Sequence, residues 1–270
     1  MSDTNPYYKD WTNTQSPKAA VVLVHGLGEH CHRYQALATH LNENDIALCA
    51  RDLPGHGKTQ GVRGHIDSFD DFENAVLSLL ANTKKQFPQA PLFLLGHSMG
   101  GLIASKLLLS SQNEFTGAML SGAAIQSPQE PPAWQQTIIK CIAKIFPKAK
   151  MLALDASKVS RDEEVVKNYY ADPLISHEKL SAQFLISMMT AMNEVKDNAK
   201  RIKLPLLIMH GTADVMTAPA GSQWLYENVS SKSKQLKMYE GLYHEIFNEP
   251  EGPEIFTEMT NWIEQQLSEA

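Results

Sequence analysis

A serine, Ser98, stands between two glycines in the sequence G-H-S-M-G (residues 96–100), directly after the apolar run Leu92–Leu95 and before a helical pattern. The G-x-S-x-G pattern in such a strand–turn–helix context is typical of a nucleophilic serine held on a tight, strained turn. Side chains at the two glycine positions would collide with neighbouring elements, and the N-terminus of the following helix favours developing negative charge. The pattern therefore predicts Ser98 as a catalytic nucleophile.

A nucleophilic serine needs a base and a third group that orients the base. Candidates follow in the order serine, acid, histidine. Asp214 comes soon after the apolar run Leu204–Met209, and His244 comes soon after the run Gln235–Tyr239. We expect Asp214 to hold one ring nitrogen of His244 while the other nitrogen takes the proton of Ser98. The predicted catalytic residues are thus Ser98, Asp214 and His244.

The sequence G-L-G (residues 26–28) follows the apolar run Ala19–Val24, where a phosphate-binding loop could begin. A dinucleotide-binding fingerprint needs a third glycine, but Cys31 stands at that position. An oxyanion loop is the better interpretation. The backbone N–H groups of Leu27 and Met99 would then point at the substrate carbonyl oxygen as it becomes tetrahedral. These two amides are the predicted oxyanion hole.

A metal site is not indicated, although His30, Cys31 and His32 are adjacent. Neighbouring side chains at the start of a helix point in different directions, and no second ligand pair has zinc spacing. Most of the ten histidines are therefore expected to be structural. Nucleophilic serine chemistry needs neither a metal nor an organic cofactor, so we expect none.

Short apolar runs alternate with longer helical patterns, which predicts a parallel sheet of six to eight strands with helices on both faces. The expected strands are Ala19–Val24, Ile46–Ala50, Leu92–Leu95, Ala118–Leu120, Leu204–Met209 and Gln235–Tyr239. The expected helices are Arg33–Glu43, Phe69–Gln86, Gly100–Ser110, Gln223–Val229 and Pro253–Gln266.

The alternation stops between residues 125 and 203, where the pattern becomes helical. The breaker-rich sequence S-P-Q-E-P-P (residues 127–132) opens this stretch, and Pro205 marks the return to a strand pattern. We interpret residues 125–203 as a helical cap inserted into a core made of residues 1–124 and 204–270. The chain is then one core with an insertion and not two independent domains.

Composition excludes several classes of protein. The chain has 270 residues, of which 43% are hydrophobic and 20% charged, as in globular proteins and unlike disordered or fibrous chains. Its net charge of −6 argues against nucleic-acid binding, which normally needs a basic face. No apolar run approaches the ~18 residues that span a bilayer, and no signal peptide is visible. Three widely spaced cysteines suggest reduced thiols, so we expect a cytoplasmic location, with peripheral contact at a membrane or lipid surface left open.

Six motifs stand out in the core. They are H-G-L-G-E-H (residues 25–30), R-D-L-P-G-H-G (51–57), R-G-H (63–65), G-H-S-M-G-G (96–101), H-G-T-A-D (210–214) and Y-E-G-L-Y-H (239–244). Two more, V-S-R-D (159–162) and Y-Y-A-D-P-L (169–174), lie in the cap. Together they resemble the monoacylglycerol lipase family of serine hydrolases, and the resemblance covers nearly the whole chain.

The resemblance implies an α/β-hydrolase fold, with a mostly parallel central sheet flanked by helices and a helical cap inserted after the sixth strand. It implies hydrolysis of a monoacylglycerol to glycerol and a fatty acid through an acyl-enzyme on Ser98. It also implies that Glu29, Arg33 and Tyr169 lie near the polar, glycerol-binding end of the pocket.

Two features depart from the family pattern. The segment before Ala19 is short, so the usual first strand is expected to be truncated or missing. Cys31 stands where small polar residues are common in the family. A buried small side chain is the favoured interpretation of this cysteine, and a modifiable thiol near the site is the alternative.

Two cap segments bear on the substrate. Residues 134–147 predict a helix with an apolar face beside a basic stripe, because Lys140, Lys144 and Lys148 recur every four residues. Such a helix either dips into a lipid surface or packs inward with a solvated lysine edge. A methionine-rich stripe in residues 180–192 suits either an acyl-chain tunnel or a small core. The residues we expect in the acyl pocket are Ile138, Ile142, Phe184, Met188 and Met189.

The expected activity is hydrolysis of monoacylglycerol or another single-chain lipid ester, with transient contact between the cap and a lipid surface. A broader carboxylesterase or lysophospholipase is the closest alternative. An acyltransferase would share every catalytic residue, and a hydrolase-fold ligand-binding protein would keep the pocket without turnover. Neither a nucleic acid nor an obligate protein partner is expected.

Overall fold

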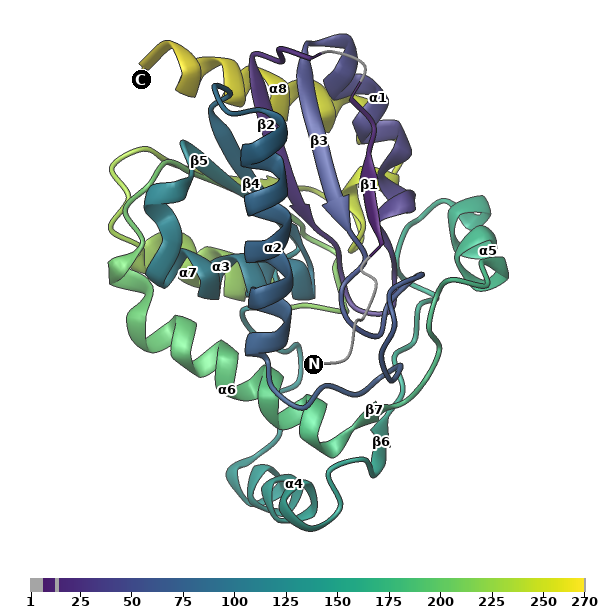
Figure 1. The fold of residues 1–270 in the computed structure, drawn as a ribbon. Helices are drawn as coiled ribbons and strands as arrows, with labels where there is room; N and C mark the ends of the chain where they lie inside the picture. Colours follow the sequence, from purple (N-terminus) through teal and green to yellow (C-terminus); the bar gives the residue numbers. More distant parts are fainter. Residues whose placement is uncertain (1–6, 13–14, 270) are drawn as a thin grey trace.

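The structure is a computed structural model that describes residues 7–12 and 15–269 (Figure 1). Within these residues a seven-stranded sheet has the order β1-β3-β2-β4-β5-β8-β9. Its strands are β1 (Tyr8–Asp10), β2 (Ala19–Val24), β3 (Ile46–Arg51), β4 (Leu92–His97), β5 (Gly117–Ser121), β8 (Leu206–Gly211) and β9 (Lys234–Tyr239). Neighbouring strands are parallel except at the edge, where β1 pairs antiparallel with β3.

Helices cover both faces of the sheet (Figure 1). The α-helices that follow the strands are α1 (Gln35–Glu43), α2 (Asp70–Gln86), α3 (Met99–Ser111), α7 (Pro219–Asn228) and α8 (Gly252–Glu269). Short 3-10 helices occupy Cys31–Tyr34, Gln112–Glu114, Ala199–Arg201 and Ile246–Asn248. Even-numbered residues of β2 pack into the core with α2 and α3, and odd-numbered ones into the core with α1 and α8. Burial on both faces explains why this strand is apolar at every position.

The chain leaves the sheet after β5 and returns at β8. Between them it forms α4 (Ala133–Ile145), β6 (Lys150–Leu152), α5 (Glu163–Ala171), β7 (Leu180–Ser181) and α6 (Ala182–Asn198). These elements lie beyond the carboxyl ends of the parallel strands (Figure 1). Strands β6 and β7 pair antiparallel, and α6 contacts both α3 and α4. Among the described residues, none of the helices is both long and apolar enough to cross a bilayer.

The strands and helices predicted from the sequence are confirmed. The short N-terminal strand is present but truncated, because β1 has three residues. The insertion follows β5, the fifth strand of the described chain. The prediction that it follows the sixth strand is wrong, because β1 is the one described strand before β2. Cys31 is fully buried, and burial together with the Asp52 carboxylate raises the pKa of its thiol far above the ordinary value. This confirms the buried small side chain.

Candidate active site

Ser98 occupies the turn between β4 and α3. Its backbone has φ 56° and ψ −120°, a positive-φ conformation that is costly for a residue with a side chain. The packing around the turn is close. A Cβ atom at Gly100 would lie 2.1 Å from the carbonyl oxygen of Val24, and one at Gly96 would lie 2.4 Å from that of Gly100. Both glycines are therefore required for α3 to start against β2 and hold Ser98 above its N-terminus.

His244 and Asp214 complete a hydrogen-bonded row with Ser98. The hydroxyl oxygen of Ser98 lies 2.8 Å from Nε2 of His244, and Nδ1 of His244 lies 2.6 Å from Oδ2 of Asp214. The three residues follow β4, β9 and β8, whose carboxyl ends meet at one edge of the sheet. When Nδ1–H donates to the carboxylate, Nε2 is free to accept the serine proton. The structure thus brings together the three residues predicted as catalytic.

Further hydrogen bonds hold the carboxylate of Asp214. The backbone N–H groups of Met216 and Thr217 donate to Oδ1 at 2.7 and 3.1 Å, and the Thr217 hydroxyl donates to Oδ2 at 2.8 Å. Nε2 of His210 lies 2.9 Å from Oδ2. Burial alone would raise the pKa of Asp214, but the charge of His244 and the hydrogen bonds from His210 and His244 hold it far below the ordinary value. The carboxylate therefore stays ionised beside the imidazole.

Sequence reasoning missed His210 and Thr217 as supports of Asp214. His210 lies four residues before Asp214 in the H-G-T-A-D motif, and its Nδ1 lies 2.7 Å from the hydroxyl oxygen of Ser222. A histidine at the end of the strand that precedes the acid is the signal that could have found it. Thr217 follows in an irregular loop and carries no comparable signal.

The pKa of His244 predicts how the rate depends on pH. Burial alone would lower this pKa, but the Asp214 carboxylate raises it above the ordinary value of 6.5. We expect kcat/KM for a neutral ester to be low in acid, where His244 is protonated and cannot accept the serine proton. It should rise with pH through a midpoint above 6.5.

A pH–rate profile with a neutral substrate checks this expectation. The neighbouring His97 does not complicate it, although the two rings lie 4.8 Å apart between centroids. Burial and the charge on His244 lower the pKa of His97 to about 4, so that its titration ends before the expected rise begins. A midpoint below 6.5, or a flat profile, would contradict the role of His244 as the base.

The loop between β2 and the first 3-10 helix lies beside Ser98, and Leu27 and Met99 line the same cavity as the serine. Met99 is the first residue of α3, and the first amides of a helix have no partner within it. The Gly26 N–H donates to Oε1 of Glu29 at 2.6 Å, which fixes the backbone next to Leu27. These positions agree with an oxyanion hole, and the role of the two amides stays a prediction.

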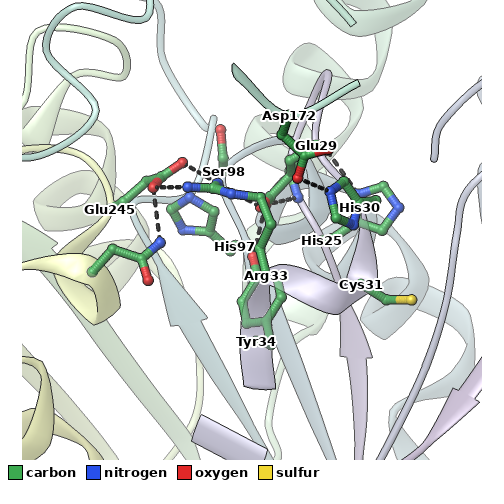
Figure 2. Close-up of polar contacts among 12 residues, drawn as sticks. His25, Glu29, His30, Cys31, Arg33, Tyr34, His97, Ser98, Asp172 and Glu245 are labelled. Atoms are coloured by element: carbon green, nitrogen blue, oxygen red, sulfur yellow. Dashed lines mark hydrogen bonds and ion pairs between the residues drawn. The ribbon is translucent and has the colours of Figure 1, made fainter. Parts of the chain in front are cut away.

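The same loop is bonded to the insertion. The N–H of Ser176 donates to the carbonyl oxygen of Gly28 at 2.8 Å, and Nε2 of His30 lies 2.9 Å from Oδ2 of Asp172 (Figure 2). Gly28 has φ 78°, and a Cβ atom there would lie 3.0 Å from the carbonyl oxygen of Ser176. The loop and the segment that follows α5 therefore form one bonded unit.

Glu29, Arg33 and Glu245 form an ion-pair cluster near Ser98 (Figure 2). Arg33 donates to Oε2 of Glu29 at 3.0 Å and to both oxygens of Glu245 at 2.5 and 2.7 Å. The guanidinium carbon also lies 4.7 Å from the ring centre of Tyr169. Burial alone would raise the pKa of Glu29, but Arg33 and its other neighbours lower it to about 2.

The three residues predicted at the polar end of the pocket differ in whether they line the cavity. Glu29 and Tyr169 line the cavity, whereas Arg33 is not among its lining residues. Its guanidinium lies between the two carboxylates and joins the loop before α1 to the loop after β9. Glu245, which sequence reasoning missed, lines the cavity instead. Its partner Arg33 is 212 positions away, so no local pattern could have identified it.

A cavity of about 430 Å³ opens at Ser98, and the insertion supplies much of its apolar wall. Met188 and Met189 line this cavity, in agreement with their predicted position. The neighbouring apolar residues of α6 that line it are Leu185 and Met192. The methionine-rich stripe of α6 therefore faces the space beside the serine, where flexible thioether side chains adapt to different apolar shapes.

Three other residues expected in the acyl pocket, Ile138, Ile142 and Phe184, do not line the cavity. Ile138 is 48% exposed on the outer face of α4, and Ile139 lines the cavity in its place. Phe184 is fully buried in the main core, where its ring packs edge-to-face on Phe72 at 5.9 Å. The contacts of α4 with α6, and of α6 with α3, set which helix faces turn inward.

Known proteins share this sequence and this architecture. A family model described as "Serine aminopeptidase, S33" matches residues 15–251. A monoacylglycerol lipase from Mycolicibacterium smegmatis is 35% identical over 260 residues, which cover 96% of this chain and 93% of the relative. The chain belongs to the monoacylglycerol lipase family of α/β-hydrolases. Membership in this family makes it a serine hydrolase and confirms the fold that the sequence motifs implied.

Solved structures from the monoacylglycerol lipase family agree closely with the fold. The crystal structure of Paleococcus ferrophilus monoacylglycerol lipase has a TM-score of 0.86 and 33% identity, with 98% of this chain and 100% of that chain covered. A soluble variant of the Saccharomyces cerevisiae monoglyceride lipase, in complex with a substrate analog, has a TM-score of 0.83 and 27% identity. That match covers 96% of this chain and 91% of the yeast chain.

Proposed function

We propose that this chain hydrolyses monoacylglycerols to glycerol and a fatty acid through an acyl-enzyme on Ser98. One observation carries the proposal. The hydrogen-bonded row of Ser98, His244 and Asp214 opens into a cavity that is apolar on the side of α6 and polar at Glu29 and Tyr169. The names of the relatives support the same substrate class.

In the proposed mechanism, Nε2 of His244 removes the proton of Ser98 as the hydroxyl oxygen attacks the ester carbonyl. The amides of Leu27 and Met99 donate to the oxygen that becomes negatively charged. His244 then protonates the departing glycerol, and the acyl-enzyme forms. A water molecule, deprotonated by the same imidazole, hydrolyses the acyl-enzyme and releases the fatty acid. Asp214 stabilises the imidazolium in both halves of the reaction.

The proposed cap is residues 125–203, with the core formed by residues 1–124 and 204–270. Two observations support these boundaries. The insertion begins after β5 and ends before β8, and its elements α4, β6 and α6 all contribute residues to the wall of the cavity. In this proposal the core holds the reacting groups, and the cap encloses the acyl chain.

Product analysis with pure protein tests the proposed function. Monoacylglycerols of increasing chain length are compared with short aryl esters and a lysophospholipid, and glycerol and fatty acid are both quantified. We expect the highest kcat/KM for a monoacylglycerol, with one glycerol released for each fatty acid. Faster turnover of short aryl esters would favour a carboxylesterase, and faster turnover of the lysophospholipid would favour a lysophospholipase.

Two controls separate the remaining alternatives. A competing alcohol added to the reaction would become acylated if the protein were an acyltransferase, so the absence of a new ester supports hydrolysis. A fluorophosphonate probe reacts with an activated serine. Failure of this probe to label Ser98, together with no turnover, would favour a ligand-binding protein.

We further propose that the cap makes transient contact with a lipid surface. Trp134, Ile138, Ile145 and Phe146 form an exposed apolar stripe on α4 and just beyond it, and the first and third are 63% and 68% exposed. Lys140, Lys144 and Lys148 are also exposed. An apolar stripe flanked by lysines suits the boundary between lipid head groups and acyl chains. Such contact would place the cap beside monoacylglycerol in a membrane.

Replacing Trp134 and Ile145 together with serine should weaken binding to anionic phospholipid vesicles by at least about tenfold, because buried apolar area drives interfacial binding. Vesicle sedimentation measures the binding. Turnover of a short, water-soluble ester should not change, since neither residue lines the cavity. Leu77→Ser, at an exposed leucine of α2, is the matched control. Equal vesicle binding by the double variant and the wild type would refute surface contact through this stripe.

A further inference from the structure

While its histidines are neutral, the cavity is lined by formal charges of one sign. Among the described residues that line it, the two with a fixed formal charge are Glu29 and Glu245, and both are carboxylates. The guanidinium of Arg33 lies behind them and is not part of the lining. One cation therefore serves two carboxylates, so these three side chains carry a net formal charge of −1.

Glu245 accepts two of the three hydrogen bonds that Arg33 donates to the two carboxylates. Its side chain is buried, and both of its oxygens accept from the guanidinium, with Nδ2 of Asn248 donating to Oε2 at 2.8 Å. A further guanidinium N–H group bonds to Glu29, and the ring of Tyr169 lies over the guanidinium. An anionic ligand in the cavity would therefore find the cation already paired and would meet carboxylate oxygens.

A hydroxyl group would find a different environment. Carboxylate oxygens accept hydrogen bonds, and a glycerol hydroxyl is a donor that can satisfy them. A phosphate or carboxylate head group offers no such match, and repulsion between like charges is strong in a site partly closed to water. The two carboxylates thus favour an alcohol that carries hydroxyl groups and oppose one that carries negative charge.

We propose that Glu245 is a specificity-determining residue, which keeps the alcohol end of the cavity negative and so selects esters of uncharged alcohols over esters whose head group is anionic. This inference rests on the proposed function, because it places the alcohol of the ester beside Glu29 and Glu245. It extends that function by assigning to the residue after His244 a selection on the charge of the leaving alcohol.

A matched pair of substrates tests the proposal: 1-oleoylglycerol and 1-oleoylglycerol 3-phosphate. The measured quantity is the ratio of their kcat/KM values. The wild type should prefer the neutral ester strongly. Glu245→Gln brings the net formal charge of the three side chains from −1 to 0 and should shift the ratio toward the phosphate by at least about tenfold.

Two variants make the readout specific to charge. Glu245→Asp keeps the charge while shortening the side chain, so it should keep the preference of the wild type for the neutral ester. Glu254→Gln makes the same charge change at an exposed position of α8 and should leave the ratio unchanged. An unchanged ratio in folded Glu245→Gln, or an equal shift in Glu254→Gln, would overturn the proposal.

A competition experiment on the wild-type protein also tests the proposal, and it requires neither a variant nor substrate turnover. A non-hydrolysable alkylglycerol ether and its 3-phosphate compete with fluorophosphonate labelling of Ser98, each below its micellar concentration. The neutral ether should protect Ser98 at concentrations at least about tenfold lower than those at which the 3-phosphate protects it. Equal protection would overturn the proposal even if Glu245→Gln failed to fold. Absence of monoacylglycerol hydrolysis in the same preparation would instead contradict the proposed function.

Discussion

Replacing Ser98 with alanine should lower the kcat for ester hydrolysis by about five to six orders of magnitude, because the attacking oxygen is removed and the remaining groups act as one unit. The fold should persist. Alanine keeps the Cβ atom that serine already carries at this positive-φ position, so the backbone strain of the turn does not change. Turnover of monoacylglycerol and the temperature of thermal unfolding are the two measurements.

Ser110→Ala provides the matched control for that experiment. Ser110 lies on the exposed side of α3, the same helix that begins next to Ser98, and its loss should leave turnover unchanged. A pure Ser98→Ala protein that retains substantial turnover would refute the nucleophile. An unfolded variant would be recognised from its thermal transition, and fluorophosphonate labelling of the wild type, followed by peptide mapping, would then identify the reactive serine.

The second large effect is expected for Asp214→Asn, which should lower kcat by about four orders of magnitude. Asparagine keeps the shape of the side chain but loses the negative charge that stabilises the protonated form of His244. Its amide can also turn an N–H group toward Nδ1, which would hold the imidazole in the wrong tautomer. The loss should appear both in turnover and in the rate of fluorophosphonate labelling.

The pH profile adds a second readout for Asp214→Asn. Because the Asp214 carboxylate raises the pKa of His244, its removal should move the rise of any residual activity to lower pH. Asp197→Asn, at an exposed position of α6, is the control and should leave both rate and profile unchanged. A loss of less than about tenfold would show that another carboxylate orients His244.

The hydrogen-bonded row of Ser98, His244 and Asp214 could be predicted from sequence because its geometry is fixed locally. Each of its three residues follows a strand within a short motif, and neighbouring parallel strands end at one edge of the sheet. Ser98 is identified further by Gly96 and Gly100, whose missing side chains are a direct consequence of close backbone packing. Local chemistry and strand order together determine where these groups meet.

The details of the pocket could not be predicted in the same way. Ile138 and Ile139 are adjacent on α4, yet Ile138 is exposed and Ile139 lines the cavity. The contacts of α4 with α6 determine which of the two faces inward. Phe184 and Met188 both belong to the apolar stripe that helical spacing predicts on α6. Met188 lines the cavity, whereas Phe184 packs in the main core against Phe72. Helical periodicity defines a face, but only tertiary packing determines what that face meets.

The bonds between the loop after β2 and the segment after α5 have a consequence for protein engineering. Ser176 and Asp172 belong to the insertion, whereas Gly28 and His30 belong to the core, and each bond joins one residue of each. A chimaera that received residues 125–203 from a relative would replace one half of both bonds and leave the other half behind. To preserve both bonds, a chimaera must therefore exchange two separate segments together, the insertion and residues 28–30.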